Sequence, residues 1–327
     1  MLLYQRVLQQ LPPGSVETGT KVTGFTPADS GTEGVRVEIQ NTAGTRASVE
    51  AALLIGADGL HSAVRAQLYP QQSEPHWGGA IMWRGVALAP PIRTGASFVG
   101  LGRARHRLVF YPISAPDPAS GLAMINWIAE ITTEQREGLD GDWNKRVRAD
   151  KFLQHFREWR FDWLDVPALI EATESIYEYP MIDRDPIPTW VNGPVALLGD
   201  AAHVMYPTGS NGASQAIVDA RVLGAHLLQH GINARALQAY DQQLCGPISE
   251  VVLRNRQAGP FGLLQMVDER CGSVFEDINS VIPHPEMQAF MAGYKQAAGF
   301  AVETLNQAPA TLPPGARLAA TTSTKSA

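Results

Sequence analysis

The sequence predicts a mixed α/β protein with more than one domain, and three observations lead to this prediction. Short β-prone runs separated by turn residues fill residues 20–55 and 80–131. Two apolar runs, 53–55 and 195–198, each stop at a glycine-flanked aspartate, as strands of α/β sheets do beside ligands. Apolar residues recur at helical spacing after residue 213. The length of 327 residues exceeds the usual size of one domain.

The composition is that of a folded protein and disfavours several classes of function. The chain is 45% hydrophobic and 18% charged, with a net charge of −6 and no basic stripe, which disfavours disorder and nucleic-acid binding. Its 2 cysteines form no CxxC and no metal-ligand spacing, so we expect a reduced, cytoplasmic protein without a metal site. No apolar run reaches the roughly 18 residues of a membrane helix, and no leader sequence opens the chain.

The N-terminal part is expected to begin with a helix and to continue as a meander of three strands. Apolar residues at helical spacing predict an amphipathic helix over residues 1–11, already under way and without a capping residue. Turn residues separate strands predicted over residues 20–25, 35–39 and 48–55. A short helix over residues 61–68 follows.

The middle of the chain predicts a second, largely antiparallel sheet, and the C-terminal third predicts helices. Runs rich in Trp, Tyr, Phe and Val indicate strands over residues 80–88, 96–101, 107–113, 122–131 and 175–179. Helical patterns cover residues 142–160, 166–172, 213–229 and 234–257, the last interrupted by Pro247. The tail has almost nothing to bury and is expected to be disordered over residues 308–327.

The first chemically suggestive motif is Gly56-Ala57-Asp58-Gly59, which is followed by Ser62 and Arg65. An aspartate at a strand end can accept hydrogen bonds from sugar hydroxyls, and Gly59 lets a ligand approach the backbone closely. The Arg65 guanidinium can form a bidentate pair of hydrogen bonds with a carboxylate or phosphate. A structural alternative stays open, in which Asp58 caps the next helix and Arg65 pairs with it.

The second motif is Gly199-Asp200-Ala201-Ala202-His203, followed by a glycine-rich segment that opens a helix. The segment contains Pro207, Gly209, Asn211 and Gly212. Free backbone N–H groups and the helix dipole at such a helix start stabilise an anion or a ring oxygen that gains negative charge. The alternative is a Pro-Gly turn before an ordinary helix.

In this order and about 140 residues apart, the two motifs resemble the DG and GD motifs of the single-component FAD-dependent aromatic monooxygenases. This family includes p-hydroxybenzoate and salicylate hydroxylases. Further stretches are similar to its phenazine-modifying members, among them 82–86, 111–114, 126–127, 179–181 and 183–186. The resemblance extends from Met1 to about Asn255.

The resemblance implies the FAD/NAD(P)-binding hydroxylase-like fold and assigns roles to the motif residues. Asp200, after Gly199, would bind the ribityl chain of FAD. Gly209, Asn211 and Gly212 would contact the flavin ring, with Pro207 packed near it. Asp58, supported by Gly59, Ser62 and Arg65, would serve FAD and NAD(P)H binding. The implied reaction uses NAD(P)H and O2 to hydroxylate an aromatic or heteroaromatic substrate, which can carry a carboxylate. Because the flavin performs the chemistry, no catalytic side chain is expected.

The chain departs from the family pattern in lacking a GxGxxG loop, whose backbone would hold the cofactor pyrophosphate. We therefore expect an N-terminally truncated FAD-binding domain that binds FAD weakly. The expected division is 1–75 and 186–260 for the FAD-binding parts, 76–185 for the substrate sheet, 261–307 for a helical extension and 308–327 for the tail.

Four aromatic residues are candidates for the substrate pocket: Trp83, Tyr111, Trp127 and Tyr206. Each could equally be a core aromatic or, for Tyr206, face the flavin. Arg84 could steer a substrate carboxylate or belong to a surface pair. Two other functions stay open: another FAD-dependent oxidoreductase, such as a dehydrogenase or epoxidase, and a non-catalytic truncated binding protein. A monomer or a homodimer is expected, and the motifs do not identify the substrate or distinguish NADH from NADPH.

Overall fold

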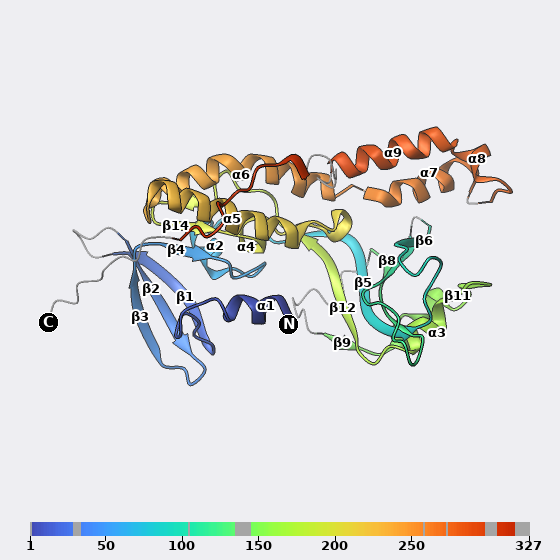
Figure 1. Cartoon of the computed structure of the whole chain (residues 1–327), viewed down its shortest axis with the longest axis horizontal. Coiled ribbons are helices and arrows are strands. Elements are labelled where there is room, and N and C mark those ends of the chain that lie inside the picture. Colours follow the sequence, from blue (N-terminus) through green and yellow to red (C-terminus); the bar gives the residue numbers. More distant parts are fainter. Residues whose placement is uncertain are drawn as a thin grey trace.

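The computed structural model describes residues 2–28, 34–103, 105–134, 145–257, 259–272, 274–297 and 306–317. Two lobes lie side by side, and long helices run across one side of both (Figure 1). The strands β5 (His76–Ala89) and β12 (Ile176–Asp183) lead from one lobe into the other. Each lobe has its own large core of buried hydrophobic residues.

The first lobe contains the expected helix, α1 (Leu2–Leu8), and the expected meander. Its strands are β1 (Thr20–Pro27), β2 (Val35–Asn41) and β3 (Arg46–Ala51), paired in the order β1-β2-β3. One expectation is wrong, because the single strand predicted over residues 48–55 is two strands. β3 ends at Ala51, and β4 (Leu54–Gly56) joins a different sheet.

That second sheet brings distant parts of the chain together. Its strands are β13 (Val191–Asn192), β14 (Val195–Leu197) and β4, and β14 runs parallel to β4 with Leu197 opposite Gly56. Both strands therefore end at the same edge. α2 (Ala63–Leu68) follows β4, and α4 (Asp200–His203) follows β14. The two sequence motifs consequently lie next to each other.

Two long helices cover this sheet. α5 (Gly212–His230) buries Val222 and Leu223, and α6 (Ala234–Asn255) buries Leu237 and Tyr240, in the same core as β14. The expected interruption at Pro247 is wrong, because α6 continues through this residue. Leu244 and Ile248 on either side of Pro247 are buried, and their packing outweighs the hydrogen bond that proline cannot donate.

The second lobe is built on an antiparallel six-stranded sheet, as expected, in the order β6-β7-β8-β5-β12-β9. The remaining strands are β6 (Val99–Gly102), β7 (His106–Pro112), β8 (Ala123–Thr132) and β9 (Arg146–Val147). One face packs on α3 (Val166–Glu171), on 3-10 turns at Ala149–Lys151 and Leu153–Phe156, and on the hairpin of β10 (Arg160–Phe161) and β11 (Leu164–Asp165).

The helix predicted over residues 142–160 is wrong where the structure describes it, from residue 145 onward. This segment forms β9, the two 3-10 turns and the start of β10. Residues 142–144 lie outside the described residues. The segment follows the sheet because Arg146 and Val147 pair with β12, and because Lys145 and Lys151 reach Glu178 on that strand.

Glu178 ties the 145–151 segment to the sheet. The side chain is 5% exposed and accepts hydrogen bonds from Lys145 Nζ at 3.0 Å, Lys151 Nζ at 2.5 Å and Trp83 Nε1 at 2.9 Å. Burial by itself would raise the pKa of Glu178, but these hydrogen bonds outweigh it and hold the pKa below its ordinary value.

We expect Glu178→Gln to lower the free energy of unfolding by about 1–3 kcal/mol at pH 7. Because the folded-state pKa is depressed, the carboxylate stabilises the fold fully above its ordinary pKa of about 4.3, and this contribution is lost as the pH falls through the folded value. Urea denaturation should therefore show the two proteins converging below about pH 4. A constant difference down to pH 3 would contradict the assignment.

A helical extension crosses the second lobe beyond α6 (Figure 1). It consists of α7 (Gly262–Cys271), α8 (Ile278–Val281) and α9 (His284–Ala297). Phe261 precedes it and lies against Arg107, whose guanidinium carbon is 5.2 Å from the ring centroid. Of the predicted tail, residues 308–317 are described, with Leu312 near Gly224 of α5, and residues 318–327 lie outside the described residues.

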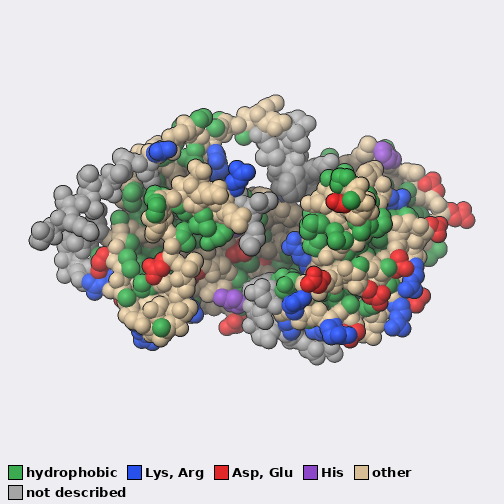
Figure 2. All heavy atoms as spheres, turned by 60° about the horizontal axis from the view of Figure 1, so that its bottom comes forward, with side chains coloured by type: hydrophobic (Ala, Val, Ile, Leu, Met, Phe, Trp, Pro, Cys, Tyr) green, Lys and Arg blue, Asp and Glu red, His purple; other side chains and the backbone are tan. Residues whose placement is uncertain are grey.

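Two further observations concern the described residues as a whole. None of their helices is both long and apolar enough to cross a membrane, and none of their side chains form a cluster suited to a metal ion. On the face shown in Figure 2, Lys and Arg side chains are interspersed with Asp and Glu. This mixture is unlike the continuous basic surface on which nucleic acid binds.

Candidate active site

Asp58 caps α2 in the structure, as the structural alternative supposed. Its Oδ2 accepts hydrogen bonds from the backbone N–H of Ala63 at 2.8 Å and of Val64 at 3.3 Å, and its Oδ1 accepts from Ser62 Oγ at 2.5 Å. Ser62 is itself the N-cap and accepts from Arg65 N. Asp58 remains exposed, so its carboxylate is also accessible to a ligand.

Arg65 does not pair with Asp58 but joins the two motifs. Only 2% of the residue is exposed, and Nη1 donates to the carbonyls of Ala201 at 2.9 Å and Ala202 at 2.6 Å. Nη2 donates to the Asp185 carbonyl at 3.0 Å. Burial, helped by the positive charge of Arg184, lowers the pKa of Arg65 to about 10. Arg65 is therefore a structural link between α2 and α4.

A buried pair fixes the start of the second motif. His203 Nε2 lies 2.5 Å from Asp219 Oδ2, and both side chains are at most 2% exposed. The same oxygen accepts the N–H of Gly199 at 2.9 Å. Gly199 has φ +61° and ψ −140°, a backbone conformation that only glycine adopts readily. Asp219 thus holds α4 against α5, while Asp200 is exposed and its carboxylate makes no hydrogen bond to any residue that the structure describes.

The glycine-rich segment forms a tight turn at the start of α5. A 3-10 turn, Pro207–Gly209, leads to Ser210 in the left-handed region with φ 52°. Asn255 Nδ2 donates to Asn211 Oδ1 at 3.0 Å, and a side chain at Gly209 would collide with Asn255 Oδ1, 2.5 Å from an ideal Cβ. Asn211 is 2% exposed, yet its Nδ2 has no hydrogen-bond partner among the described residues.

The six-stranded sheet separates two groups of candidate pocket residues. Trp83 and Trp127 lie in the core on the helix-covered face, where their indole N–H groups donate to Glu178 and Thr173. On the opposite face, Tyr111 pairs with Asn126 across β7 and β8 and stacks on Phe98. The structure therefore does not bring the four candidate aromatics together.

A cavity of about 520 Å³ lies on that opposite face. Its lining includes Val86, Leu88, Met124, Tyr177 and Tyr179, with Arg84 as its cation. Arg84 Nε donates to Asn126 Oδ1 at 3.0 Å. Asn126 is 1% exposed, and its Nδ2 has no partner among the described residues. The cavity thus combines apolar and aromatic walls with the guanidinium of Arg84 and the carboxylate of Glu174.

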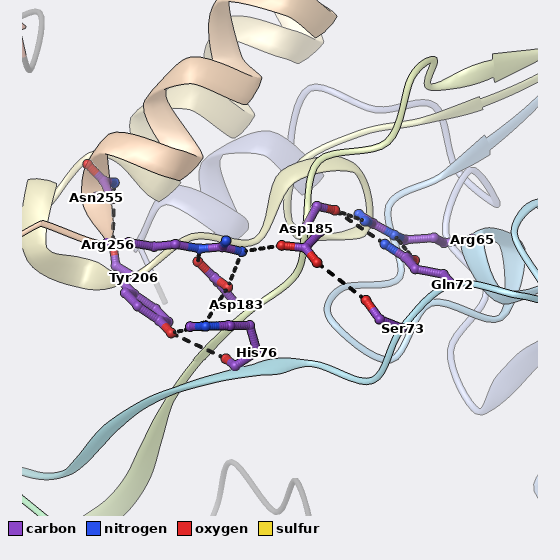
Figure 3. Close-up of polar contacts among 9 residues, drawn as sticks. All are labelled: Arg65, Gln72, Ser73, His76, Asp183, Asp185, Tyr206, Asn255 and Arg256. Atoms are coloured by element: carbon purple, nitrogen blue, oxygen red, sulfur yellow. Dashed lines mark hydrogen bonds and ion pairs between the residues drawn. The ribbon is translucent and has the colours of Figure 1, made fainter.

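Tyr206 lies between the glycine-rich turn and the start of β5. Its hydroxyl is 2.5 Å from His76 Nδ1, at the start of the strand that carries Arg84 (Figure 3). Arg256, directly after α6, forms two hydrogen bonds with Asp183 and one with Asp185, at 2.8 to 2.9 Å. Figure 3 shows these side chains meeting where β5, β12, α6 and the glycine-rich turn converge.

Residues 3–255 match the family described as FAD binding domain. The chain belongs to this family. Among curated FAD-binding relatives, it is 40% identical over 258 residues to phenazine 1,6-dicarboxylic acid hydroxylase PhzS of Lysobacter antibioticus, an alignment that covers 78% of this chain and 63% of PhzS. It is 31% identical over 262 residues to a 3-amino-4-hydroxybenzoate 2-monooxygenase of Streptomyces platensis, covering 79% of this chain and 61% of that protein.

Solved structures confirm the mixed α/β hydroxylase fold of the FAD-binding family. A single-residue variant of HpxO from Klebsiella pneumoniae, complexed with FAD, matches with a TM-score of 0.64 at 24% identity, covering 93% of this chain and 70% of that one. A salicylate hydroxylase substrate complex matches with a TM-score of 0.63 at 23% identity, covering 92% of this chain and 74% of that one. The chain spans just over three fifths of the two curated relatives.

The turn before α5 fits a flavin. The Asn211 amide is a buried donor without an acceptor in the part of the chain that the structure describes, and the Asn211 side chain does not cap the first N–H groups of α5. These groups suit the electron-rich edge of an isoalloxazine ring. Sequence reasoning named most of this turn but did not foresee Asn255 or the role of Asp219. One feature of the sequence could have indicated a role for Asp219: it is a charged residue close to Val222 and Leu223, which are buried in the same helix.

Proposed function

We propose that this chain is part of an FAD-dependent monooxygenase that hydroxylates an aromatic or heteroaromatic molecule with NAD(P)H and O2. One observation carries the proposal: Arg65 joins the two motif segments beside a turn with an unpaired buried amide, and the adjoining sheet holds an aromatic cavity. The relatives named as monooxygenases of aromatic compounds support it. When bound, reduced FAD supplies the activation of O2.

In this proposal, groups of the protein bind and orient the cofactor. Gly209, Asn211 and Gly212 hold the ring edge, with Pro207 beside it, and the exposed Asp200 carboxylate accepts from ribityl hydroxyls. Asp58 and Gly59 serve the cofactor from the neighbouring strand end, while Ser62 and Arg65 keep that segment in place.

The substrate is proposed to bind within residues 76–185, on the open face of the sheet. Tyr177 and Tyr179 offer planar surfaces, and Arg84, whose Nε donates to Asn126, offers guanidinium N–H donors. This set suits an aromatic carboxylate, whose oxygens accept charge-assisted hydrogen bonds. Tyr111 adds a half-buried aromatic group on the same face.

We also propose that these 327 residues alone bind FAD weakly. They contain no GxGxxG, so the contacts above address the flavin and ribityl parts and leave the pyrophosphate without its usual backbone cradle. A stable stoichiometric FAD complex of this chain would contradict the proposal.

The test combines FAD titration with turnover. We expect flavin fluorescence to be quenched with a Kd in the micromolar range, and NAD(P)H oxidation to rise with an aromatic carboxylate under ¹⁸O2, giving a product with one labelled oxygen. Arg84→Met should lower kcat/KM for the carboxylate about 100-fold, but less than about threefold for the same ring without the carboxylate. A product without label would instead indicate a dehydrogenase, and no quenching at any FAD concentration would contradict the proposal that this chain alone binds FAD.

A further inference from the structure

We propose that Tyr206 is a positioning residue, and that its hydrogen bond to His76 sets the place of the flavin-binding turn relative to the substrate cavity. The inference rests on the proposed function and adds to it a mechanical link between the two sites. It starts from the location of the two residues. Tyr206 directly precedes Pro207, the first residue of the turn, and His76 is the first residue of β5, which carries Arg84 into the cavity.

The side chain of Tyr206 is seated on β5. The residue is 3% exposed, and its hydroxyl lies 2.5 Å from His76 Nδ1 and 3.4 Å from the His76 carbonyl. The ring lies over Gly78, since a Cβ at that position would be 2.8 Å from Tyr206 Cζ. Phenylalanine would fill the same space without a polar partner. A buried hydroxyl needs a hydrogen bond, and His76 provides it from the other lobe.

The backbone of Tyr206 is held independently by α6. Asn255 Nδ2 donates to the Tyr206 carbonyl at 3.3 Å and to Asn211 Oδ1 at 3.0 Å. Asn255 thereby contacts both ends of the segment 206–211. The residue is fixed from two directions, by a helix over the first lobe and by a strand of the second.

The partner of Tyr206 is itself anchored. His76 Nδ1 lies 3.8 Å from Asp183 Oδ1, and the Asp183 carboxylate is fully buried against Arg256. Asp183 pairs with His76 across β12 and β5, so the nearby carboxylate and the strand register together position the imidazole (Figure 3). Half of the His76 side chain is exposed, which leaves this network as its main restraint.

The physical consequence is a fixed distance between cofactor turn and substrate groups. Release of the Tyr206 hydroxyl would remove the hydrogen bond that joins the residue before the turn to the first residue of β5. Segment 207–212 would then move relative to Arg84, although neither the turn nor the cavity would have lost a contact group. Misplacement of this kind lowers the rate at which bound substrate reacts more than it lowers the affinity for the substrate.

The experiment compares Tyr206→Phe and Gly78→Ala with wild type and with the control Tyr69→Phe. Gly78→Ala keeps both polar groups but displaces the ring. The control also removes a hydroxyl, one that donates to the Thr189 carbonyl at 2.6 Å in the first lobe. Hydrogen exchange of the backbone amides of 207–212 in the FAD-free chain, the Kd for FAD and the circular dichroism of bound flavin are measured for each.

We expect Tyr206→Phe and Gly78→Ala to speed exchange at 207–212 about tenfold, to raise the FAD Kd about tenfold and to change the flavin circular dichroism. Tyr69→Phe should leave all three as in wild type. His76→Ala should change the three measurements as Tyr206→Phe does. The double variant His76→Ala/Tyr206→Phe should show changes no larger than those of either single variant, and His76→Asn should show smaller changes than His76→Ala.

Additive effects in the double variant, or wild-type exchange at 207–212 in Tyr206→Phe, would overturn the inference. Absence of FAD binding by the wild-type chain would contradict the proposed function instead. In that case the exchange measurements, which use the chain without FAD, still decide whether Tyr206 and His76 hold the turn.

Discussion

The Arg65→Met variant should unfold about 5–10 °C below wild type, which corresponds to a loss of about 3 kcal/mol. Methionine fills most of the volume but donates no hydrogen bond. The carbonyls of Ala201, Ala202 and Asp185 would each lose a buried donor, at about 1–3 kcal/mol for each group left unpaired. Part of this loss is offset because burial of the guanidinium, visible in its lowered pKa, is no longer required.

Arg148→Met is the matched control for that measurement. Its side chain is 88% exposed, and its ion pair with Asp150 is 3.2 Å long, so its removal should change the unfolding temperature by less than about 1 °C. Because Arg65 bridges α2 and α4, its loss should also weaken FAD binding. Equal unfolding temperatures for the two variants would show that Arg65 is not the link between the motifs.

Asp219→Ala is expected to be still more damaging, at about 3–5 kcal/mol of unfolding free energy. The substitution leaves His203 buried without its partner and removes the acceptor of the Gly199 N–H. Asp219→Asn, which retains one carbonyl oxygen, should lose less. Chemical denaturation measures both effects, with the exposed Asp162→Ala as the control.

An additional readout separates this pair from general stability. Since Asp219 holds α4, whose first residue is Asp200, Asp219→Asn should raise the Kd for FAD even at temperatures where the variant is fully folded. A folded Asp219→Asn protein with wild-type FAD affinity would mean that the pair stabilises the lobe but does not position Asp200.

Local patterns were sufficient for most elements of this fold. Alternation and turn residues predicted the meander and the antiparallel sheet, and helical spacing predicted α5 and α6, because in these segments the buried face is set by neighbours in sequence. The segment 145–160 failed for the opposite reason. Its helical pattern yields to contacts with Glu178, a residue that no local window contains.

In the candidate site, too, features set by nearby residues were predicted and features set by distant residues were missed. The motif residues of the cofactor turn were identified from glycine spacing and resemblance, and they do lie together. Partners that come from distant elements were missed, such as Asn255 for Asn211 and the Ala201 and Ala202 carbonyls for Arg65. Trp83 and Trp127 illustrate a further limit of prediction from the sequence. Each lies next to a polar residue that faces the open side of the sheet, and because side chains alternate along a strand, the tryptophan rings point into the core instead.

The parallel pairing of β4 with β14 bears on how the protein is made. Val195 lies opposite Leu54, yet the entire six-stranded sheet is inserted between them in the sequence. During synthesis the ribosome must therefore deliver the second lobe before the second strand of the pair exists. Contacts of such high sequence separation form late and slowly. We expect the six-stranded sheet to fold first and to bring the two strand ends within reach, so that competence for the cofactor arises only after β14 has been synthesised.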